Sequence, residues 1–322
     1  MIGLIIGLVC GGLLILLGLL LLFVDNTWRK VFNHRGDGSN SIRYNHPSDY
    51  PNLNIKHGYF ETRKGYRLSY NIYKKDAVNI KATLVMIHGI GFSHYYLFPM
   101  IEKLCNDGYQ VFAYDQFASG ASEGRSIGAM TTSLKDLPFV FKFVESNPEL
   151  NKYPLYVFGH SWGGFIAFSS LRYSKNIKKV ISVAGFTNEG CFSPTVSLLI
   201  KLRNFFYYGF DAFYNNRKSV RKSNAKMMYL QGDHDLVVNP AFAGKKYEID
   251  AKKNPNLSVV ILPNKGHCPY NDDESQAAQD KVLGEFGLLG GVYVPDDHFV
   301  DFTKISKVDE KVYKIIVDFY NN

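Results

Sequence analysis

The sequence is poor in cysteine, and the cysteines it has predict neither a disulfide framework nor a metal site. Among 322 residues there are four cysteines, and Cys10 lies inside a long apolar run. The others, Cys105, Cys191 and Cys268, are an odd number and lack the short spacings of zinc-binding cysteines. We therefore expect reduced thiols, no metal and no cofactor.

Patterns typical of nucleic-acid binding are also missing, although the chain is basic. The net charge is +8 and the isoelectric point is about 9.0, but the lysines and arginines are scattered along the chain. No zinc-finger, RNA-recognition or helix-turn-helix pattern is present. The charge predicts a solvated basic surface, or one that lies against anionic lipid, and no nucleic-acid partner.

Charged side chains are absent from residues 2–24, and this absence predicts a membrane anchor over residues 1–25. A helix over the uncharged run is about 34 Å long, enough to cross the hydrocarbon core of a bilayer. A cleavable signal peptide is the rival interpretation. It is disfavoured because the run is too long, no basic residue precedes it and no small-residue cleavage site follows it.

The residues after the anchor favour one orientation in the membrane. Trp28 is expected at the interface, and Arg29, Lys30 and Arg35 follow the apolar run. By the positive-inside rule, these cations predict a single-pass protein whose remaining chain lies on the cytoplasmic side. Nothing in the sequence indicates the oligomeric state.

Beyond the anchor, composition divides the chain into a polar tether, residues 26–54, and one α/β domain, residues 55–322. The domain begins with two segments, 57–62 and 66–73, in which apolar and polar side chains alternate around a basic turn that contains glycine. This alternation predicts an antiparallel hairpin.

Strands and helices then take turns along the rest of the domain. The expected strands are 82–87, 110–114, a short run ending near Phe158, 179–184, 227–231 and 257–262. The expected helices are 95–106, 129–146, one directly after Ser161, one from about Pro240, and 308–320. Such alternation predicts a mostly parallel central sheet with helices on both faces.

A Gly-x-Ser-x-Gly pattern lies between one of these strands and the helix that follows it, with Ser161 at its centre. In this place the pattern is typical of a nucleophile elbow, a tight turn that holds the serine above the sheet. Gly159 and Gly163 allow neighbouring backbone to come close. The dipole of the following helix favours negative charge near the serine. Ser161 is therefore the candidate nucleophile.

A serine nucleophile needs a histidine to accept its proton and a carboxylate to orient that histidine. Both are expected later in the chain, beyond the carboxyl ends of strands. His267 follows a glycine at one such end and is the candidate base. Asp235 is the preferred acid because apolar neighbours anchor its loop, and Asp233 remains an alternative.

Negative charge on a reacting carbonyl oxygen needs backbone N–H donors. One is expected to be the amide of Trp162, directly after the nucleophile. The other is expected in the loop after the first parallel strand, from Ile90, with Gly91 as the alternative. His88 and His160 are expected to order these loops rather than to transfer protons.

These motifs resemble those of the α/β-hydrolases, in particular the serine aminopeptidase and monoacylglycerol-lipase-like group, also called lysophospholipase-like. The shared segments are His88-Gly89, residues 115–124, residues 159–164, Gly232-x-x-Asp235 and Gly266-His267. The resemblance runs from about Tyr59 to the C-terminus and implies an α/β-hydrolase fold with a helical cap. The chain departs from the family in having Ala118-Ser119 where Gly-His is usual. It also has a longer segment, 271–303, after the histidine, which we interpret as an insertion.

The cap is expected over residues 186–223, which are rich in aromatic and aliphatic side chains. Such a segment can act as an apolar lid that admits acyl chains, although ordinary packing of a helical cap explains the same composition. Together with the anchor, the resemblance implies a membrane-anchored serine hydrolase. Its expected substrates are small lipid-derived carboxylic esters of the monoacylglycerol or lysophospholipid type, cleaved through an acyl-enzyme.

Two alternative functions stay open at this point. A serine aminopeptidase-like peptidase would need carboxylates to hold the substrate amine, and no acidic cluster stands out in the cap. A non-catalytic binding protein on the same fold is the other alternative. It is disfavoured because a serine, an acid and a histidine are present in the expected order. The sequence indicates neither the acyl length nor the head group of the substrate.

Overall fold

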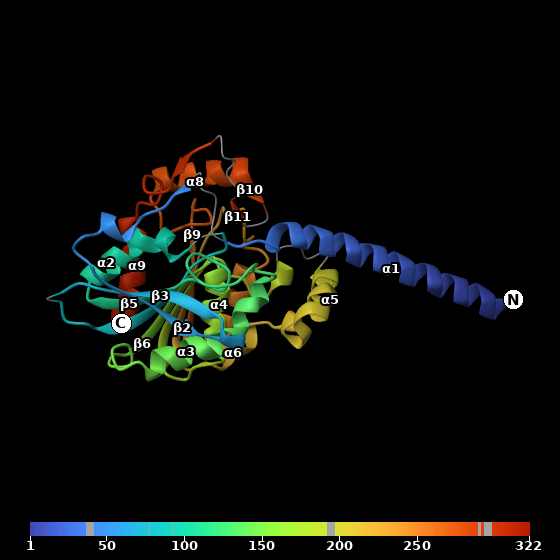
Figure 1. Cartoon of the computed structure of the whole chain (residues 1–322), viewed down its shortest axis with the longest axis horizontal. Helices are drawn as coiled ribbons and strands as arrows, with labels where there is room; N and C mark the ends of the chain where they lie inside the picture. The colour runs from blue at the N-terminus through green and yellow to red at the C-terminus, as the bar shows by residue number, and fades with distance from the viewer. Residues whose placement is uncertain (37–41, 77, 92, 192–196, 289–290, 293–297) are drawn as a thin grey trace.

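A computed structural model describes the chain except for residues 37–41, 77, 92, 192–196, 289–290 and 293–297. Parts of the expected tether, of the cap and of the segment 271–303 therefore lie outside the described residues. Figure 1 shows a domain of strands and helices from which one long N-terminal helix projects.

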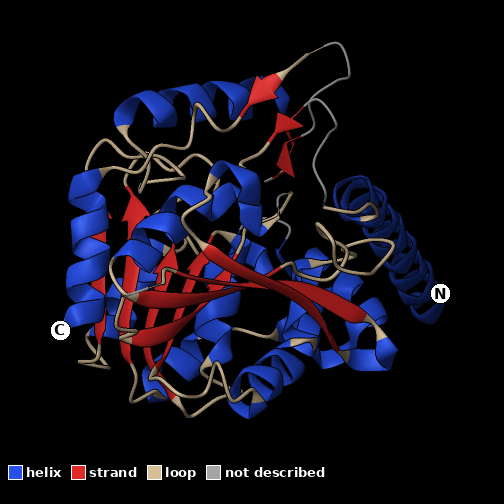
Figure 2. Cartoon of the chain, turned by 60° about the vertical axis from the view of Figure 1, so that its left-hand side comes forward, coloured by secondary structure: helices blue, strands red, loops and turns tan. Residues whose placement is uncertain are grey.

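The centre of the domain is an eight-stranded sheet, drawn in red in Figure 2. Its strands are β2 (Asn54–Glu61), β3 (Arg67–Lys74), β4 (Ala82–Ile87), β5 (Tyr109–Tyr114), β6 (Leu155–His160), β7 (Ile177–Val183), β8 (Lys226–Gly232) and β9 (Leu257–Leu262). They lie in the order β2-β3-β5-β4-β6-β7-β8-β9. The pairs β2–β3 and β3–β5 are antiparallel and all other neighbours are parallel. The predicted hairpin and the mostly parallel sheet are confirmed.

The central strands are buried on both faces, as their nearly continuous apolar sequences require. Every residue of β4 and β5 is buried. Along β4, Val85 and Ile87 belong to one hydrophobic core, whereas Leu84 and Met86 belong to the other. Successive side chains of a strand point to opposite faces, so a single strand supplies both cores.

Helices cover both faces of the sheet. Residues of α2 (Phe98–Asn106) and α9 (Glu310–Asn321) belong to one core, and residues of α3 (Leu137–Ser146), α4 (Trp162–Ser170) and α7 (Gly244–Ala251) belong to the other. The described part of the cap contains η5 (Glu189–Cys191), α5 (Ser197–Tyr208), η7 (Gly209–Phe213) and α6 (Arg217–Lys222).

Two expected helices each begin as a short 3-10 helix. The segment 95–106 starts with η3 (His94–Leu97) before α2, and 129–146 starts with η4 (Met130–Lys135) before α3. In both cases a proline stands at the start of the α-helix. Proline lacks an N–H group and is suited to the first turn of a helix, so it marks a new start rather than a continuation.

The N-terminal helix, α1 (Ile2–Phe32), is longer than the expected anchor. Within it, residues Ile2–Lys30 are long and apolar enough to cross a membrane, with a mean hydropathy of 2.9 in the most apolar window. By length and composition, α1 is therefore a candidate membrane span.

The last turns of α1 pack against the domain, which corrects the expectation for Trp28. Val24, Trp28 and Phe32 are buried in a core of the domain, so the Trp28 ring packs against protein rather than being exposed to lipid head groups. These residues are spaced four apart and share one face of the helix. An apolar face suits a protein core as well as a membrane, which is why the sequence pattern did not separate the two.

The segment after α1 also differs from the expected tether. Gly128 donates to the Phe32 carbonyl at 2.8 Å, and Gly36 donates to the Ala118 carbonyl at 2.7 Å. Further on, β1 (Ile42–Arg43) pairs in parallel with β12 (Val300–Asp301). These bonds join backbone to backbone, so a polar composition gives no sign of them. The described part of this segment is held along the domain.

The long segment after His267 has regular structure in its described part. It contains α8 (Asp273–Phe286), the short pair β10 (Gly287–Leu288) and β11 (Gly291–Val292), and β12. Its strand β12 pairs with β1, which precedes the central sheet in the chain. The segment is therefore bonded to a distant part of the chain and does more than extend a loop.

Candidate active site

The nucleophile elbow has the strained geometry that its sequence predicts. Ser161 lies between β6 and α4 with φ 55° and ψ −116°. A residue other than glycine rarely adopts a positive φ, and it keeps this conformation only where the surrounding structure enforces it. A Cβ at Gly159 would lie 2.0 Å from the Gly163 carbonyl oxygen, and one at Gly163 would lie 2.0 Å from that of Ile87. Only glycine fits at either position.

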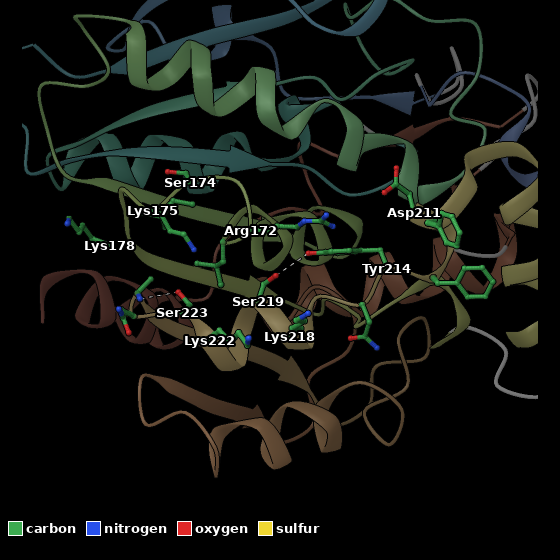
Figure 3. Close-up of a pocket in the computed structure, with 17 residues that line it drawn as sticks. Arg172, Ser174, Lys175, Lys178, Asp211, Tyr214, Lys218, Ser219, Lys222 and Ser223 are labelled. Atoms are coloured by element: carbon green, nitrogen blue, oxygen red, sulfur yellow. Dashed lines mark hydrogen bonds between the residues drawn. The ribbon is translucent and has the colours of Figure 1, made fainter.

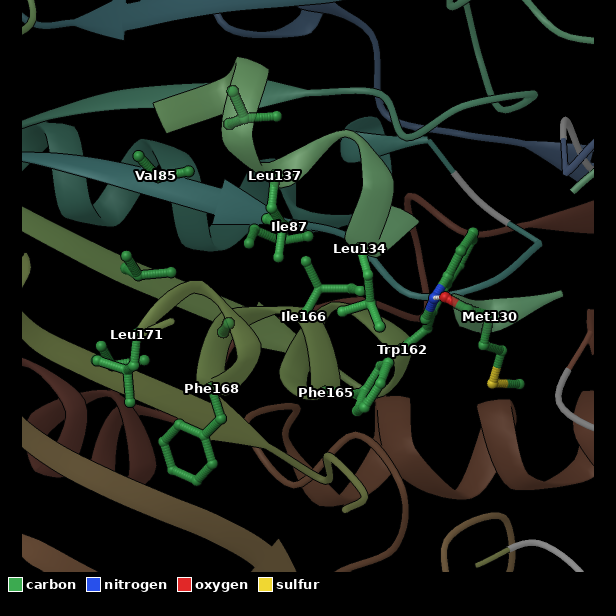
Figure 4. Packing of buried hydrophobic residues seen from close by; sticks show 14 of the residues in the cluster. Val85, Ile87, Met130, Leu134, Leu137, Trp162, Phe165, Ile166, Phe168 and Leu171 are labelled. Atoms are coloured by element: carbon green, nitrogen blue, oxygen red, sulfur yellow. Dashed lines mark hydrogen bonds between the residues drawn. The ribbon is translucent and has the colours of Figure 1, made fainter. Parts of the chain in front are cut away.

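The helix behind the serine is locked into the core. Figure 4 shows Trp162, Phe165 and Ile166 of α4 packed among residues of β4 and of the segment that leads into α3. The indole N–H of Trp162 donates to the Met130 carbonyl at 2.8 Å. The backbone amide of Trp162 is thus held in place by its own side chain.

The structure pairs His267 with Asp235. The Nδ1 atom of His267 lies 3.0 Å and 3.1 Å from the two Asp235 carboxylate oxygens, and both side chains are buried. The alternative acid, Asp233, bonds instead to His234 Nδ1 at 2.6 Å and to the Asn264 amide at 2.7 Å, in an exposed place. The geometry therefore separates the two aspartates that sequence reasoning left open.

The surroundings of Asp235 keep its carboxyl group ionised. Burial alone would raise the pKa of Asp235. This effect is outweighed by the charge and hydrogen bond of His267 and by hydrogen bonds from the Val238 amide and the Gln231 side chain, so the pKa is lowered. The carboxylate accepts only, which requires the proton of His267 to sit on Nδ1. Its Nε2 is then free to accept a proton from a nucleophile.

Ser161 and His267 are brought into the same neighbourhood through His160. The ring of His160, next to the serine, lies 4.9 Å from the ring of His267, and its Nε2 donates to the His267 carbonyl at 2.9 Å. Among the described residues no hydrogen bond joins the Ser161 hydroxyl to His267. Such bonds are often long without substrate and shorten when it binds.

The two expected oxyanion donors are available. Within the described part of the chain, the amides of Ile90 and Trp162 donate to no backbone or side-chain acceptor. The Ile90 loop is held by His88, whose Nε2 accepts from the Gln116 amide at 2.9 Å. Burial lowers the pKa of His88 to about 4, so its ring is neutral and can accept this bond. His88 therefore orders the loop, as expected.

Sequence reasoning missed the roles of Gln116 and Asp115 in this loop region. The Gln116 side chain donates to the His88 carbonyl at 2.7 Å. Asp115 accepts from His94 Nδ1 at 2.6 Å and from the Ala121 amide at 3.0 Å. Both residues lie in the shared segment 115–124, which was the only signal that marked them. At the family departure, Ala118 adopts φ 58°, a conformation that suits the usual glycine better.

A separate cavity of about 840 Å³ lies between the cap and the end of α4 (Figure 3). Its cationic lining residues are Arg172, Lys175, Lys178, Lys218 and Lys222. Ser161, Asp235 and His267 do not line it, so it is distinct from the candidate active site. Among the described residues, no group of three or more His, Cys, Asp or Glu side chains is placed to hold a metal ion.

Comparison with known proteins finds a match over the part of the chain that contains the elbow. Residues 78–210 match the family model described as serine aminopeptidase, S33. A probable 1-acylglycerol-3-phosphate O-acyltransferase of Oryza sativa subsp. japonica is 31% identical over 33% of this chain and 26% of its own length. The monoglyceride lipase of Saccharomyces cerevisiae is 31% identical over 34% of this chain and 36% of its own length. The chain thus spans well under half the length of these curated relatives.

A solved structure extends the likeness over more of the fold. An esterase of Pyrococcus furiosus superposes with a TM-score of 0.57 at 21% identity, covering 77% of this chain and 96% of that protein. At this identity the superposition establishes the fold alone.

Proposed function

We propose that this chain, which belongs to the α/β-hydrolases of the serine aminopeptidase and monoacylglycerol-lipase-like group, is a membrane-anchored serine hydrolase of lipid-derived carboxylic esters. The observation that carries the proposal is the buried His267–Asp235 pair, 3.0 Å apart, together with a serine held at φ 55° whose sequence neighbour His160 contacts His267. A strained serine and an oriented histidine are the groups that acyl transfer requires.

The proposed reaction has two halves. Ser161 Oγ attacks the ester carbonyl while His267 Nε2 takes its proton, and Asp235 stabilises the imidazolium that forms. The Trp162 and Ile90 amides stabilise the negative oxygen of the tetrahedral intermediate. The intermediate expels the alcohol, which receives the proton from His267, and leaves an acyl group on Ser161. Water, activated by the same histidine, then releases the acid and restores the serine.

The cap and the anchor support a lipid substrate. Phe206 is 75% exposed and Phe210 is 84% exposed, and both lie on or directly after α5, the cap helix that contacts α1. Large apolar side chains exposed beside a candidate membrane span are suited to a bilayer surface. The monoglyceride lipase among the relatives supports the same substrate class. We place the domain on the cytoplasmic side because of the cations that follow the span.

Hydrolysis by the full-length protein in detergent micelles tests the proposal. We expect release of fatty acid from monoacylglycerols or lysophospholipids, and loss of at least about 10³-fold in kcat in Ser161→Ala. Ser146→Ala is the matched control, since Ser146 is exposed and bonds only to the backbone of its own helix; it should retain full activity.

Other outcomes would redirect the proposal. Turnover of aminoacyl amides in preference to esters would favour the peptidase alternative. Transfer of the acyl group to an added alcohol, with little free acid, would favour an acyltransferase. A folded wild-type protein with no turnover of any of these substrates would favour a non-catalytic binding role.

A further inference from the structure

The domain end of α1 is bound to the cap by a largely buried ion pair. Arg203 of α5 is 6% exposed, and its Nε lies 2.9 Å from the Asp25 carboxylate. Arg29 lies 2.8 Å from the other Asp25 oxygen and donates to the Tyr207 hydroxyl at 2.7 Å. Figure 1 shows α5 beside this end of α1. The candidate membrane span therefore ends in a specific contact with the cap.

From Arg203 a chain of side-chain hydrogen bonds leads into the domain. Arg203 Nη1 donates to the Asn204 side-chain oxygen at 2.9 Å. The Asn204 amide group donates to one carboxylate oxygen of Glu189. Asn204 is fully buried and Glu189 is 3% exposed. Buried polar groups keep their partners because the loss of one leaves the other unsatisfied.

The chain of bonds ends at the nucleophile elbow. The second Glu189 oxygen accepts from the backbone amide of Thr131 at 2.8 Å. Its neighbour Met130 accepts the indole N–H of Trp162, a contact drawn as a dashed line in Figure 4. Trp162 directly follows Ser161 and carries an expected oxyanion donor. Asp25 is thus linked to Trp162 through Arg203 and Asn204 of α5, Glu189 of η5, and Thr131 and Met130 of η4.

Removal of the Asp25 carboxylate would disturb this link in a defined way. A buried arginine that loses its paired carboxylate destabilises the folded protein unless it pairs with another carboxylate. The nearest acid along the chain of bonds is Glu189, which Asn204 and Thr131 now hold. Burial raises the pKa of Glu189 to about 7, and the positive charge of a freed Arg203 would favour its ionised form. Attraction between the two would then draw the Glu189 carboxylate from the Thr131 amide, and the segment that fixes Trp162 would lose its support.

We propose that the domain end of α1 is a positioning element for the oxyanion site: Asp25 fixes Arg203, and the bonded chain through Asn204, Glu189 and Thr131 holds the segment that orients Trp162. The inference rests on the proposed function for its catalytic consequence. Its structural part, the coupling between Asp25 and Trp162, stands without it. The anchor then supplies part of the active-site geometry, beyond keeping the enzyme at a membrane.

The two tryptophans of the chain make this coupling measurable. In a Trp28→Phe background the remaining tryptophan is Trp162, whose emission reports on its own surroundings. We expect Asp25→Asn in this background to shift the Trp162 emission and to lower kcat about tenfold, with KM changed by less than about twofold. Asp25→Glu should restore most of kcat, because it restores the carboxylate.

Lys30→Gln is the matched control, since it removes one charge from an exposed part of the same helix end. It should leave both the emission and kcat at the background values. All variants are to be compared as full-length protein in the same micelles. An Asp25→Asn protein that matches Lys30→Gln in emission and in kcat would overturn the proposal. A rise in KM alone, with kcat and emission unchanged, would also overturn it.

A second variant tests the proposal independently if Asp25→Asn does not fold. Arg203→Lys keeps the charge but lacks the fork that reaches Asp25 and Asn204 together, so it should produce the same loss of kcat and the same emission shift. Full kcat in Arg203→Lys would contradict the proposal. If the background protein hydrolyses no ester, the proposed function fails, whereas the emission still decides whether Asp25 is coupled to Trp162.

Discussion

Gln116 and His88 bind each other twice: the Gln116 amide donates to His88 Nε2 at 2.9 Å, and the Gln116 side chain donates to the His88 carbonyl at 2.7 Å. All of these groups are buried. The pair fixes the start of the loop whose Ile90 amide is the second expected oxyanion donor.

Gln116→Met should therefore affect catalysis as well as stability. Methionine is similar in size but leaves the His88 carbonyl without its donor, which should lower the free energy of unfolding by about 1–3 kcal/mol. Looser placement of Ile90 should lower kcat about tenfold. Steady-state kinetics and urea unfolding measure the two effects. Unchanged kcat with lowered stability would remove this loop from the oxyanion site.

The two aspartates near the end of β8 should differ sharply in their effect on activity. Asp235→Asn should lower kcat by about 10³–10⁴-fold, because an amide does not hold His267 with its proton on Nδ1. Asp233→Asn should change kcat by less than about twofold, since its pair with His234 is exposed. The ester hydrolysis assay decides between them. A large loss in Asp233→Asn and a small one in Asp235→Asn would reverse the assignment.

Two glycines should respond in opposite ways to alanine. At Gly163 a Cβ would lie 2.0 Å from the Ile87 carbonyl oxygen, so Gly163→Ala should lower the free energy of unfolding by about 3 kcal/mol or more. Gly284 lies in α8 with nothing within 4 Å of an added Cβ, and Gly284→Ala should raise the free energy by about 0.5–1 kcal/mol. Urea titration compares them. Equal effects would contradict the close approach at the elbow.

Stability should depend on pH through His160. Burial, followed by the nearby charge of His267, lowers its pKa from 6.5 to about 3 in the folded protein. Below about pH 6.5 the unfolded chain binds a proton that the folded chain does not bind until about pH 3. The free energy of unfolding should therefore fall with decreasing pH across this window, by up to about 1.4 kcal/mol per unit from this group.

His160→Gln provides the comparison, because glutamine can still donate to the His267 carbonyl but does not titrate. Unfolding free energies at about pH 7 and about pH 5 should differ less in the variant than in the wild type. The same pH dependence in both proteins would show that His160 is not held neutral by burial.

Much of the fold was predictable because its signals are local. The apolar run of β4 was recognised with its observed bounds, and so was the run of β9. The tight turn at Ser161 was predictable because the glycines that it needs are its neighbours in sequence. His267 and Asp235 follow strand ends, and parallel strands bring their carboxyl ends to one edge of a sheet.

What the sequence did not predict depends on contacts between distant residues. Asp25 and Arg203 meet across 178 positions, and neither has a neighbour pattern that indicates the other. Trp28 is apolar on a helix face that suits a membrane or a core equally. The bond from Gln116 to His88 depends on β4 and β5 lying side by side, which only the strand order determines.

The most direct test of the account is the position of a covalent adduct. Full-length protein is treated with a fluorophosphonate, which reacts with activated serines, and the modified peptide is identified by mass spectrometry. We predict a single adduct on Ser161, absent in Ser161→Ala and reduced by about 10²-fold or more in rate in His267→Ala. An adduct on another serine, or labelling at the wild-type rate in His267→Ala, would contradict the proposal that His267 activates Ser161.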